Sequence, residues 1–377
     1  MSIRPTDPTA LLSAAQDGDR VALARLLSYV ERGGQQSRQV AHLAYRTPGR
    51  AYTVGLTGAP GSGKSTLTDR LIGLARQGGF PPEPATLDQP ASGSSGAGSS
   101  RDDSPPAGGS PAGGSPAGGS PDEPAHQVAV LAIDPSSPFT GGAILGDRVR
   151  MQDHALDDGV YIRSMATRGH LGGLAVAVPD AVRVLSAAGL PLVLVETVGV
   201  GQVEVDVASA TDTTVVVVNP GWGDAIQANK AGLLEIADLF VVNKADRPGV
   251  RETRRDLEGM LDLTTLGAWR PPVVETVASS GDGVDDLWRA IADHRAYLTS
   301  SGLLAKLRRE RLEREFHKIL VARLDLEIVE LHGTAGYASM IEAVTNGELD
   351  PYDAADRLLA GIVSPDPKQD RDDTSFN

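Results

Sequence analysis

Short apolar runs that alternate with amphipathic stretches constrain the fold of this chain more than any other feature of its sequence. The runs are rich in β-branched residues and four to six residues long, which suits a strand and is too short for a helix. Because neighbouring residues in each run are apolar, both faces of the strand are expected to be buried in a parallel sheet covered by helices. The predicted strands are residues 52–57, 128–133, 192–196, 214–219, 239–243 and 273–276.

Helical stretches separate these strands, and the alternation indicates a doubly wound α/β fold with a mostly parallel sheet. The strands and helices together predict one sheet domain over residues 51–300. The predicted helices of this domain are residues 65–77, 179–188, 225–236, 250–262 and 284–299.

Helical segments without strands flank this domain. Residues 1–50 contain two predicted helices, 8–16 and 20–32, with apolar side chains at helical spacing. Residues 301–362 contain a long predicted helix, 303–331, whose large apolar residues recur in steps of four or eight. This stripe predicts either a surface for a partner or packing within the chain. The stripe comprises Leu304, Leu312, Phe316, Leu320 and Leu324.

Pro, Gly, Ser and Ala dominate residues 81–124, where the sequence Pro-Ala-Gly-Gly-Ser occurs three times in succession. Such a composition cannot form a core and favours a solvated coil. We therefore expect a disordered insertion within the sheet domain, because a long loop between close ends costs little entropy. A docking role for the insertion is the alternative. Residues 363–377 are also expected to be a disordered tail.

The composition argues against a generic nucleic-acid binder, with a local basic patch as the alternative, and it excludes cysteine chemistry. The chain has 49 acidic and 35 basic residues and a formal net charge of -14, whereas a nucleic-acid binder needs a basic surface to neutralise phosphates. Cys is absent, which excludes disulfides, thiolate metal sites and a cysteine nucleophile. The apolar runs are far shorter than the roughly 20 residues that span a bilayer. We expect a cytoplasmic protein with no nucleic-acid or membrane partner.

A complete G-x-x-x-x-G-K-S phosphate loop lies between the first predicted strand and the helix that follows it. Its glycines allow backbone N–H groups to curl around a β-phosphate at a helix N-terminus. Lys64 is predicted to bind the β- and γ-phosphate oxygens, and the Ser65 hydroxyl to bind Mg²⁺. The loop comprises Gly58, Ala59, Pro60, Gly61, Ser62, Gly63, Lys64 and Ser65, followed by Thr66.

A second motif, Asn243-Lys244-Ala245-Asp246, directly follows a predicted strand and matches the N-K-x-D pattern of GTPases. The Asp246 carboxylate can accept hydrogen bonds from the guanine N1–H and exocyclic amine, which adenine cannot offer, so the motif favours GTP over ATP. Ala278 and Ser279 follow the next strand and are predicted to cap the base through backbone N–H groups.

Glu196 ends another predicted strand, and Gly199 follows three residues later. An acid in this position suits a Walker B carboxylate, and Gly199 suits a sensor of the γ-phosphate. Glu196 is therefore predicted to bind the Mg²⁺ hydration shell or to orient the attacking water. Val200 occupies the position where Ras-like enzymes have a water-orienting Gln, so intrinsic hydrolysis is expected to be slow.

Two further acids are candidate Mg²⁺ ligands, because this ion prefers a few oxygen ligands and retained waters. Asp134 ends a predicted strand and Asp147 lies in the Pro/Gly-rich segment after it, a pattern typical of a switch loop. Turn capping is the alternative for each acid. The seven His residues are dispersed and predict no metal site.

Together these motifs resemble the MeaB/MMAA type of P-loop GTPase, also called ArgK or LAO/AO transport ATPase. The resemblance covers about residues 11–359 except the insertion, and Gln202-Val203-Glu204 departs from the family, which commonly has Ser in the middle position. The strings that carry it are GAPGSGKST from Gly58, DPSSPFTGGAILGDRVRM from Asp134, RSMATRGHLGGL from Arg163, ETVGVGQ from Glu196 and NKAD from Asn243.

The resemblance implies a GTPase chaperone that protects an adenosylcobalamin-dependent acyl-CoA mutase, usually methylmalonyl-CoA mutase, and gates its cobalamin loading. It implies GTP/GDP and Mg²⁺ as cofactors and a homodimer formed by the C-terminal helical arm. Lys64, Glu196 and Asp134 would be catalytic, and residues 220–232 would form a further switch loop. The metal shell would comprise Ser65, Asp134, Asp147 and Glu196.

Three alternatives follow from the same motifs. A P-loop kinase or ATPase acting on a small molecule or transport protein shares the phosphate loop but does not need Asn243 and Asp246. A nickel-inserting GTPase needs a cluster of Cys and His ligands, whereas this chain has no Cys and its seven His residues are dispersed. A scaffold with a degenerate site is disfavoured by the presence of Lys64, Ser65 and Asp246.

Overall fold

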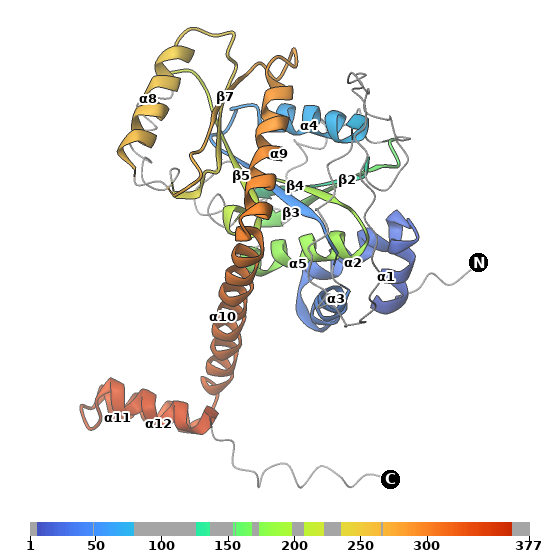
Figure 1. Cartoon of the computed structure of the whole chain (residues 1–377). Helices are drawn as coiled ribbons and strands as arrows, with labels where there is room; N and C mark the ends of the chain where they lie inside the picture. Colours follow the sequence, from blue (N-terminus) through green and yellow to red (C-terminus); the bar gives the residue numbers. More distant parts are fainter. Residues whose placement is uncertain are drawn as a thin grey trace, which may run out of the picture. The chain divides into compact units, whose positions relative to one another are not determined.

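A computed structural model describes residues 6–47, 49–78, 126–135, 154, 156–167, 173–197, 207–221, 235–264 and 267–363. These residues fall into two compact units, one within Met1–Arg311 and the other within Leu312–Asn377 (Figure 1). The predicted insertion at 81–124 lies outside the described residues, as do all residues of the predicted tail 363–377 except Val363, which ends a helix. Disorder of the two segments therefore remains a prediction.

The first unit contains one seven-stranded sheet in which every strand pair is parallel. The strand order is β3-β2-β4-β1-β5-β6-β7, so β2 to β4 lie on one side of β1 and β5 to β7 lie on the other. The doubly wound α/β fold is confirmed. The strands are β1 Tyr52–Thr57, β2 Val128–Pro135, β3 Val160–Thr167, β4 Leu192–Thr197, β5 Thr213–Val218, β6 Leu239–Asn243 and β7 Val273–Thr276.

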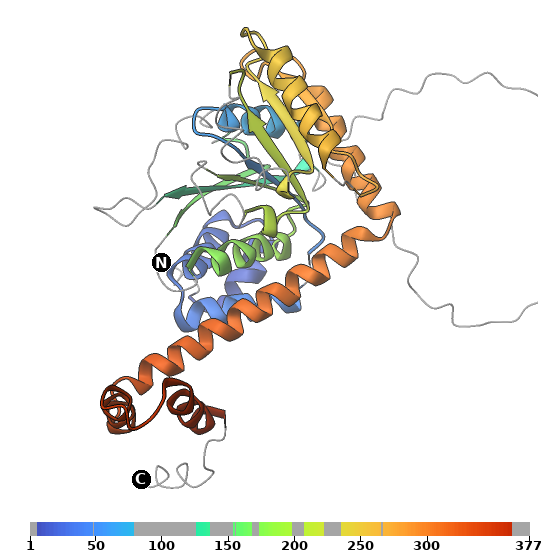
Figure 2. The ribbon, with the colours of Figure 1, turned by 90° about the vertical axis from the view of Figure 1, so that its left-hand side faces the viewer.

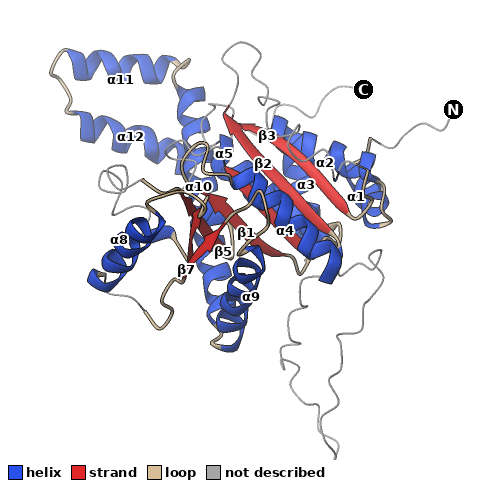
Figure 3. Cartoon of the chain, turned by 90° about the horizontal axis from the view of Figure 1, so that it is seen from above, coloured by secondary structure: helices blue, strands red, loops and turns tan. Residues whose placement is uncertain are grey.

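Helices cover both faces of the sheet, as the apolar runs predict (Figure 3). In β4, Leu192 and Leu194 join the core formed with the helices α4 and α9, whereas Val193 and Val195 join the core formed with α5. Successive side chains of a strand point to opposite faces, so each run has to be apolar throughout. The flanking helices are α4 Lys64–Gly78, α5 Gly173–Ala187, α8 Val250–Leu263 and α9 Val284–Ser300.

Three N-terminal helices share the α5 core (Figures 1 and 2). Asp7 and Asp19 begin the first two by accepting backbone N–H groups, with Val21 N–H 2.8 Å from the Asp19 carboxylate. Two of the three helices match the predicted ranges, and the third was not predicted. They are α1 Pro8–Gln16, α2 Arg20–Arg32 and α3 Gly34–Arg46.

Besides α3, and apart from shifts of one or two residues at element ends, two elements of the first unit differ from the sequence predictions. The strand β3 was not predicted, because it lies at the sheet edge and its partly exposed Arg163 and Ser164 interrupt the apolar run. The helix α5 begins at Gly173 and not at Pro179, which lies inside it. Proline in a helix interior removes a hydrogen bond, but buried side chains on both sides of it, Val178 and Ala181, pack α5 into the core.

The long helix α10, Leu303–Leu331, matches the predicted range. Its residues up to Arg311 belong to the first unit, and Leu304 is buried there with β-strand side chains. Leu304 is therefore not part of an exposed stripe. The second unit contains the rest of α10 with α11 Ala335–Thr345 and α12 Pro351–Val363. In it, the other four residues of the predicted stripe are exposed.

Asp212, just before β5, attaches the start of α10 to the amino end of the sheet. Its carboxylate is buried and accepts hydrogen bonds from Arg308 at 2.8 Å, Arg311 at 3.2 Å and the Thr53 N–H at 3.1 Å. Arg308 also donates to the Ala51 carbonyl. Burial by itself raises the pKa of Asp212, but the two guanidinium groups and the Thr53 N–H outweigh it, and the pKa lies below its ordinary value.

Replacement of Asp212 by Asn should lower the free energy of unfolding by about 3 kcal/mol, because two guanidinium groups lose a buried anion. The folded-state pKa is depressed, so this stabilisation is present above the unfolded pKa of about 4 and is lost as the pH falls through the folded pKa. Denaturant unfolding at pH 7 and at pH 3 measures both effects. Asp286→Asn, which removes an exposed ion pair with Arg289, should change the free energy by less than about 1 kcal/mol.

Candidate nucleotide site

The predicted nucleotide-binding residues gather at the carboxyl ends of the central strands, where ligands of doubly wound sheets bind. The phosphate loop leaves β1, the central strand at which the winding direction reverses. The helix α4 begins at Lys64, so the loop ends at a helix N-terminus.

Two glycines of this loop are required by its surroundings. Gly58 has φ +130° and Gly63 has φ +94°, a region that favours glycine. A Cβ on Gly58 would lie 2.1 Å from the Val217 carbonyl oxygen, and a Cβ on Gly63 would lie 2.2 Å from Asn243 Nδ2. The loop therefore contacts β5 and the end of β6 so closely that no side chain fits at either position.

Lys64 lies across the loop that precedes it. Its ammonium group donates to the carbonyl oxygens of Gly58 at 2.7 Å and Ala59 at 2.9 Å, and its side chain is buried. The ammonium is thus held within the curve of the loop. Pro60, Gly61 and Thr66 are exposed, and Ser62 is buried.

Glu196 is brought to the first turn of α4 by the register of the sheet, in which it pairs with Leu56. One oxygen of its buried carboxylate accepts the Ser65 hydroxyl at 2.6 Å, and the other accepts the Thr68 hydroxyl at 3.0 Å. Thr68 was not predicted as a site residue. Its position one turn after Ser65 on α4 is the signal that identifies it, since residues three apart share a helix face.

Asn243, the last residue of β6, joins the phosphate loop to the loop after β7. Its amide nitrogen donates to the Ser62 carbonyl at 2.7 Å. Its amide oxygen accepts the Thr276 hydroxyl and the Ala278 N–H, both at 3.1 Å. All three bonds are buried, so this side chain brings the predicted phosphate and base motifs together.

The turn after Asn243 is held against the same two loops. Lys244 adopts φ +59° and donates from its ammonium group to the Gly61 carbonyl at 2.6 Å, while Ala245 N–H bonds to the Thr276 carbonyl. Asp246 is exposed at the end of this turn. The residue predicted to recognise the base therefore has a side chain open to solvent beside the phosphate loop.

The structure describes only part of the other predicted residues. Asp134 lies at the carboxyl end of β2, beside β4, but its side chain is outside the described set. Asp147, Gly199 and Val200 lie outside the described residues, as do residues 222–232 of the predicted switch loop. Ser279 is exposed and Ala278 is buried, with its N–H bonded to Asn243.

The oxygen ligands near the phosphate loop suit Mg²⁺. No cluster of three or more His, Cys, Asp or Glu side chains that suits a metal occurs in the described part of the chain. Mg²⁺ at nucleotide sites needs fewer, because one or two protein oxygens complement phosphate oxygens and waters. The Ser65 hydroxyl and the Glu196 carboxylate, 2.6 Å apart, supply such a set.

A parallel sheet with a phosphate loop leaving its central strand, a lysine within the loop and a carboxylate on the neighbouring strand defines a P-loop nucleoside triphosphatase. The profile of the family described as "Methylmalonyl Co-A mutase-associated GTPase MeaB" matches residues 23–98 and 121–344. The chain belongs to this family, and the resemblance seen in the sequence motifs is confirmed.

Individual relatives support this family assignment. The chain is 44% identical over 359 residues to a Pyrococcus abyssi protein named "Putative GTPase", covering 94% of this chain and 96% of the relative. It is 30% identical over 372 residues to the mouse protein "Methylmalonic aciduria type A homolog, mitochondrial", covering 92% and 77%. A crystal structure titled "LAO/AO transport system kinase" has the same fold, with a TM-score of 0.62, 24% identity and coverage of 97% and 100%.

Among the described residues, no helix is both long enough and apolar enough to cross a membrane.

Replacement of Gly63 by Ala should weaken GDP binding by at least about tenfold, because the new Cβ displaces Asn243 and the positive φ is strained by about 1 kcal/mol. Calorimetric titration and thermal melting measure the two effects. Gly73→Ala is the control, since the same methyl group in α4 meets nothing within 4 Å. That variant should keep its GDP affinity and melt at an equal or higher temperature; equal losses in both variants would contradict the assigned role of the Gly63 contact.

Proposed function

We propose that this protein is a GTPase that binds GTP and GDP with Mg²⁺ and acts as a chaperone of an adenosylcobalamin-dependent acyl-CoA mutase, with methylmalonyl-CoA mutase as the partner. The observation that carries the GTPase proposal is the Asn243 side chain, which holds the N-K-x-D turn and the loop at Ala278 against the phosphate loop. Family membership carries the proposal of the mutase partner.

Base selectivity would rest on Asp246. Its carboxylate is exposed at a turn that is fixed through Asn243 and Lys244, so it is available to a base bound beside the phosphate loop. A carboxylate accepts the N1–H and the exocyclic amine of guanine, and adenine lacks both donors. Binding of adenine would leave the carboxylate without these partners, which favours GTP.

Lys64, Ser65 and Glu196 would position and stabilise the transferring phosphoryl group. Lys64 supplies a buried positive charge within the loop, and electrostatic stabilisation of phosphoryl transfer needs such a fixed cation. Ser65 and Glu196 would hold Mg²⁺, which neutralises phosphate charge when bound, and Asp134 and Asp147 would complete this shell. Val200 in place of a water-orienting Gln supports slow intrinsic hydrolysis.

The second unit would form the homodimer interface. Large apolar side chains are exposed along α10, α11 and α12, which suits burial against a second copy. The residues available for this contact are Leu312, Phe316, Ile319, Leu320, Val321, Leu324, Leu326, Val329, Ile341, Tyr352 and Leu359.

The Asp246→Asn variant tests base recognition. It should weaken GTP binding at least about tenfold and shift preference toward xanthosine triphosphate, because an amide donates to the extra xanthine oxygen where a carboxylate only accepts. Competition of GTP, xanthosine triphosphate and ATP for the purified protein measures the shift. Asp256→Asn removes the same charge from an exposed position on α8 and should change nothing. Tight ATP binding by the unaltered protein would favour the kinase or ATPase alternative.

The mutase partnership is tested by binding in two nucleotide states. The affinity of methylmalonyl-CoA mutase for this protein should differ between GDP and a non-hydrolysable GTP analogue, with a coupling of about 1–3 kcal/mol, and GTP affinity must change by the same factor when the mutase binds. Hydrolysis should accelerate when the mutase is added. Lys64→Ala should lose hydrolysis. Equal mutase affinity in both states together with unchanged turnover would refute the chaperone proposal and leave the GTPase proposal standing.

A further inference from the structure

Arg70 connects the helix that begins at the phosphate loop with the loop that follows β7. It lies on α4 about two helical turns after Lys64. Its Nε donates to the Ala278 carbonyl at 3.0 Å, and its Nη2 donates to the Ser279 carbonyl at 2.6 Å. One side chain therefore bonds to two successive carbonyls of the loop predicted to cap the base.

Ala278 is held from two sides. Its N–H donates to the Asn243 amide oxygen, and its carbonyl accepts from Arg70. The rest of the loop is closed by its own backbone bonds, including Val277 N–H to the Asp282 carbonyl at 2.9 Å. The orientation of the peptide between Ala278 and Ser279 is thus set by Arg70, since no other described contact binds its carbonyl.

The planar trans geometry of this peptide determines the direction in which the Ser279 N–H points. In a trans peptide the carbonyl and the N–H point in opposite directions, and all described peptide bonds are trans. Because the Ala278 carbonyl points to Arg70, the Ser279 N–H of the same peptide points away from Arg70. Among the described residues this N–H has no acceptor, so it is available to a ligand.

We propose that Arg70 is a positioning residue for base recognition, which fixes the Ser279 N–H as the donor to the O6 atom of guanine. This inference rests on the proposed function, because it requires a guanine nucleotide. Asp246 would recognise the N1–H and amine of the base, and the peptide held by Arg70 would recognise the oxygen. Adenine has an amino group at this position and cannot accept from the Ser279 N–H.

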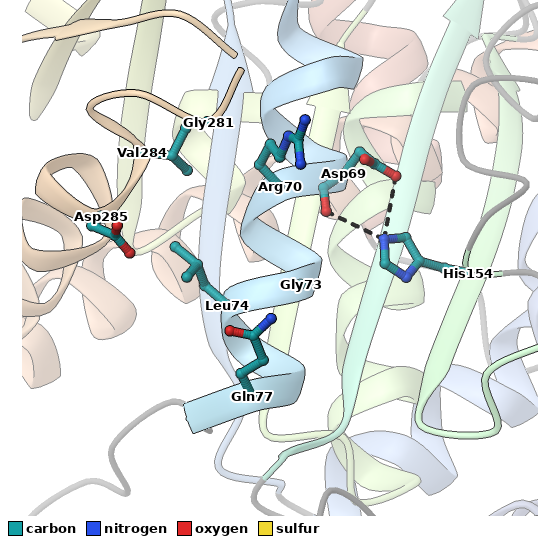
Figure 4. Close-up of a pocket in the computed structure, with 9 residues that line it drawn as sticks. All are labelled: Asp69, Arg70, Gly73, Leu74, Gln77, His154, Gly281, Val284 and Asp285. Atoms are coloured by element: carbon teal, nitrogen blue, oxygen red, sulfur yellow. Dashed lines mark hydrogen bonds and ion pairs between the residues drawn. The ribbon is translucent and has the colours of Figure 1, made fainter. Parts of the chain in front are cut away.

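The exposure of Arg70 determines how strongly its replacement should affect nucleotide binding and folding. Figure 4 shows Arg70 on one wall of a pocket of about 380 Å³, with Gly281 and Val284 on the other. Arg70 is exposed, so water competes for its guanidinium group. Loss of these bonds should therefore weaken recognition without unfolding the sheet domain.

The test compares Arg70→Met, Arg70→Lys and Arg289→Met. Met removes every donor, whereas Lys keeps one cationic donor. Arg289 lies on α9, pairs with Asp286 and is largely exposed, so Arg289→Met removes the same charge without altering the loop contacts. Dissociation constants are measured for GDP, inosine diphosphate and ADP, and thermal melting establishes that each variant is folded. GDP and inosine diphosphate both carry O6, and ADP does not.

Arg70→Met should weaken binding of GDP and inosine diphosphate by the same factor of about ten and leave ADP binding within about twofold. Arg70→Lys should show a smaller loss of the same selectivity, and Arg289→Met should match the unaltered protein. If Arg70→Met does not fold, the Lys variant supplies the comparison.

Equal weakening of all three nucleotides, or no weakening, would overturn the role of Arg70 in recognising O6. If the unaltered protein binds ADP as tightly as GDP, the guanine specificity of the proposed function fails instead. The two failures are therefore distinguishable from one set of measurements.

Discussion

The site depends most on one buried amide. Asn243 bonds to the loop after β1 and to the loop after β7, two segments whose strands are separated in the sheet by β5 and β6. A buried polar group without its hydrogen-bond partner lowers the stability of the folded protein by about 1–3 kcal/mol. Any other arrangement of the loops would break one or more of these three bonds, so the bonds together favour the observed arrangement. The close approach also explains why Gly63 has no room for a side chain. The segments predicted to bind the phosphates and the base are thereby held as a single unit.

The opposite end of the sheet serves a different purpose. There the buried Asp212 carboxylate binds Arg308 and Arg311 of α10. Nearby, Tyr52 and His294 both bond to the Thr213 hydroxyl, at 2.6 and 2.9 Å, and burial lowers the pKa of His294 to about 4. With this pKa the imidazole is neutral at pH 7, so it adds hydrogen bonds without adding a further cation to the two guanidinium groups. These bonds at the amino end of the sheet thus hold the first part of α10, the helix that continues into the second unit.

Several sequence predictions were reproduced because their signals are local. The strands β1 and β6, which are buried along their whole length, have the predicted bounds, since an apolar run buried on both faces has few alternatives. The edge strand β7 also has the predicted bounds, although three of its four residues are only partly buried. The edge strand β3 was missed because the partly exposed Arg163 and Ser164 interrupt its apolar run. The start of α5 was misplaced because Pro179 normally marks a helix beginning, and only the packing of Val178 and Ala181 shows that the helix continues through it.

The sequence by itself determined the class of fold, the phosphate loop and the family, because each is written in consecutive residues whose spacing matches a backbone geometry. Only the tertiary structure decided which side chains form hydrogen bonds with residues distant in the sequence. Glu196 with Thr68, Asn243 with Ser62 and Ala278, and Arg70 with the Ala278 and Ser279 carbonyls are contacts of this kind. No local pattern encodes them, because parallel strands bring together chain segments that are far apart in sequence, and the contact depends on the register and packing of the whole sheet.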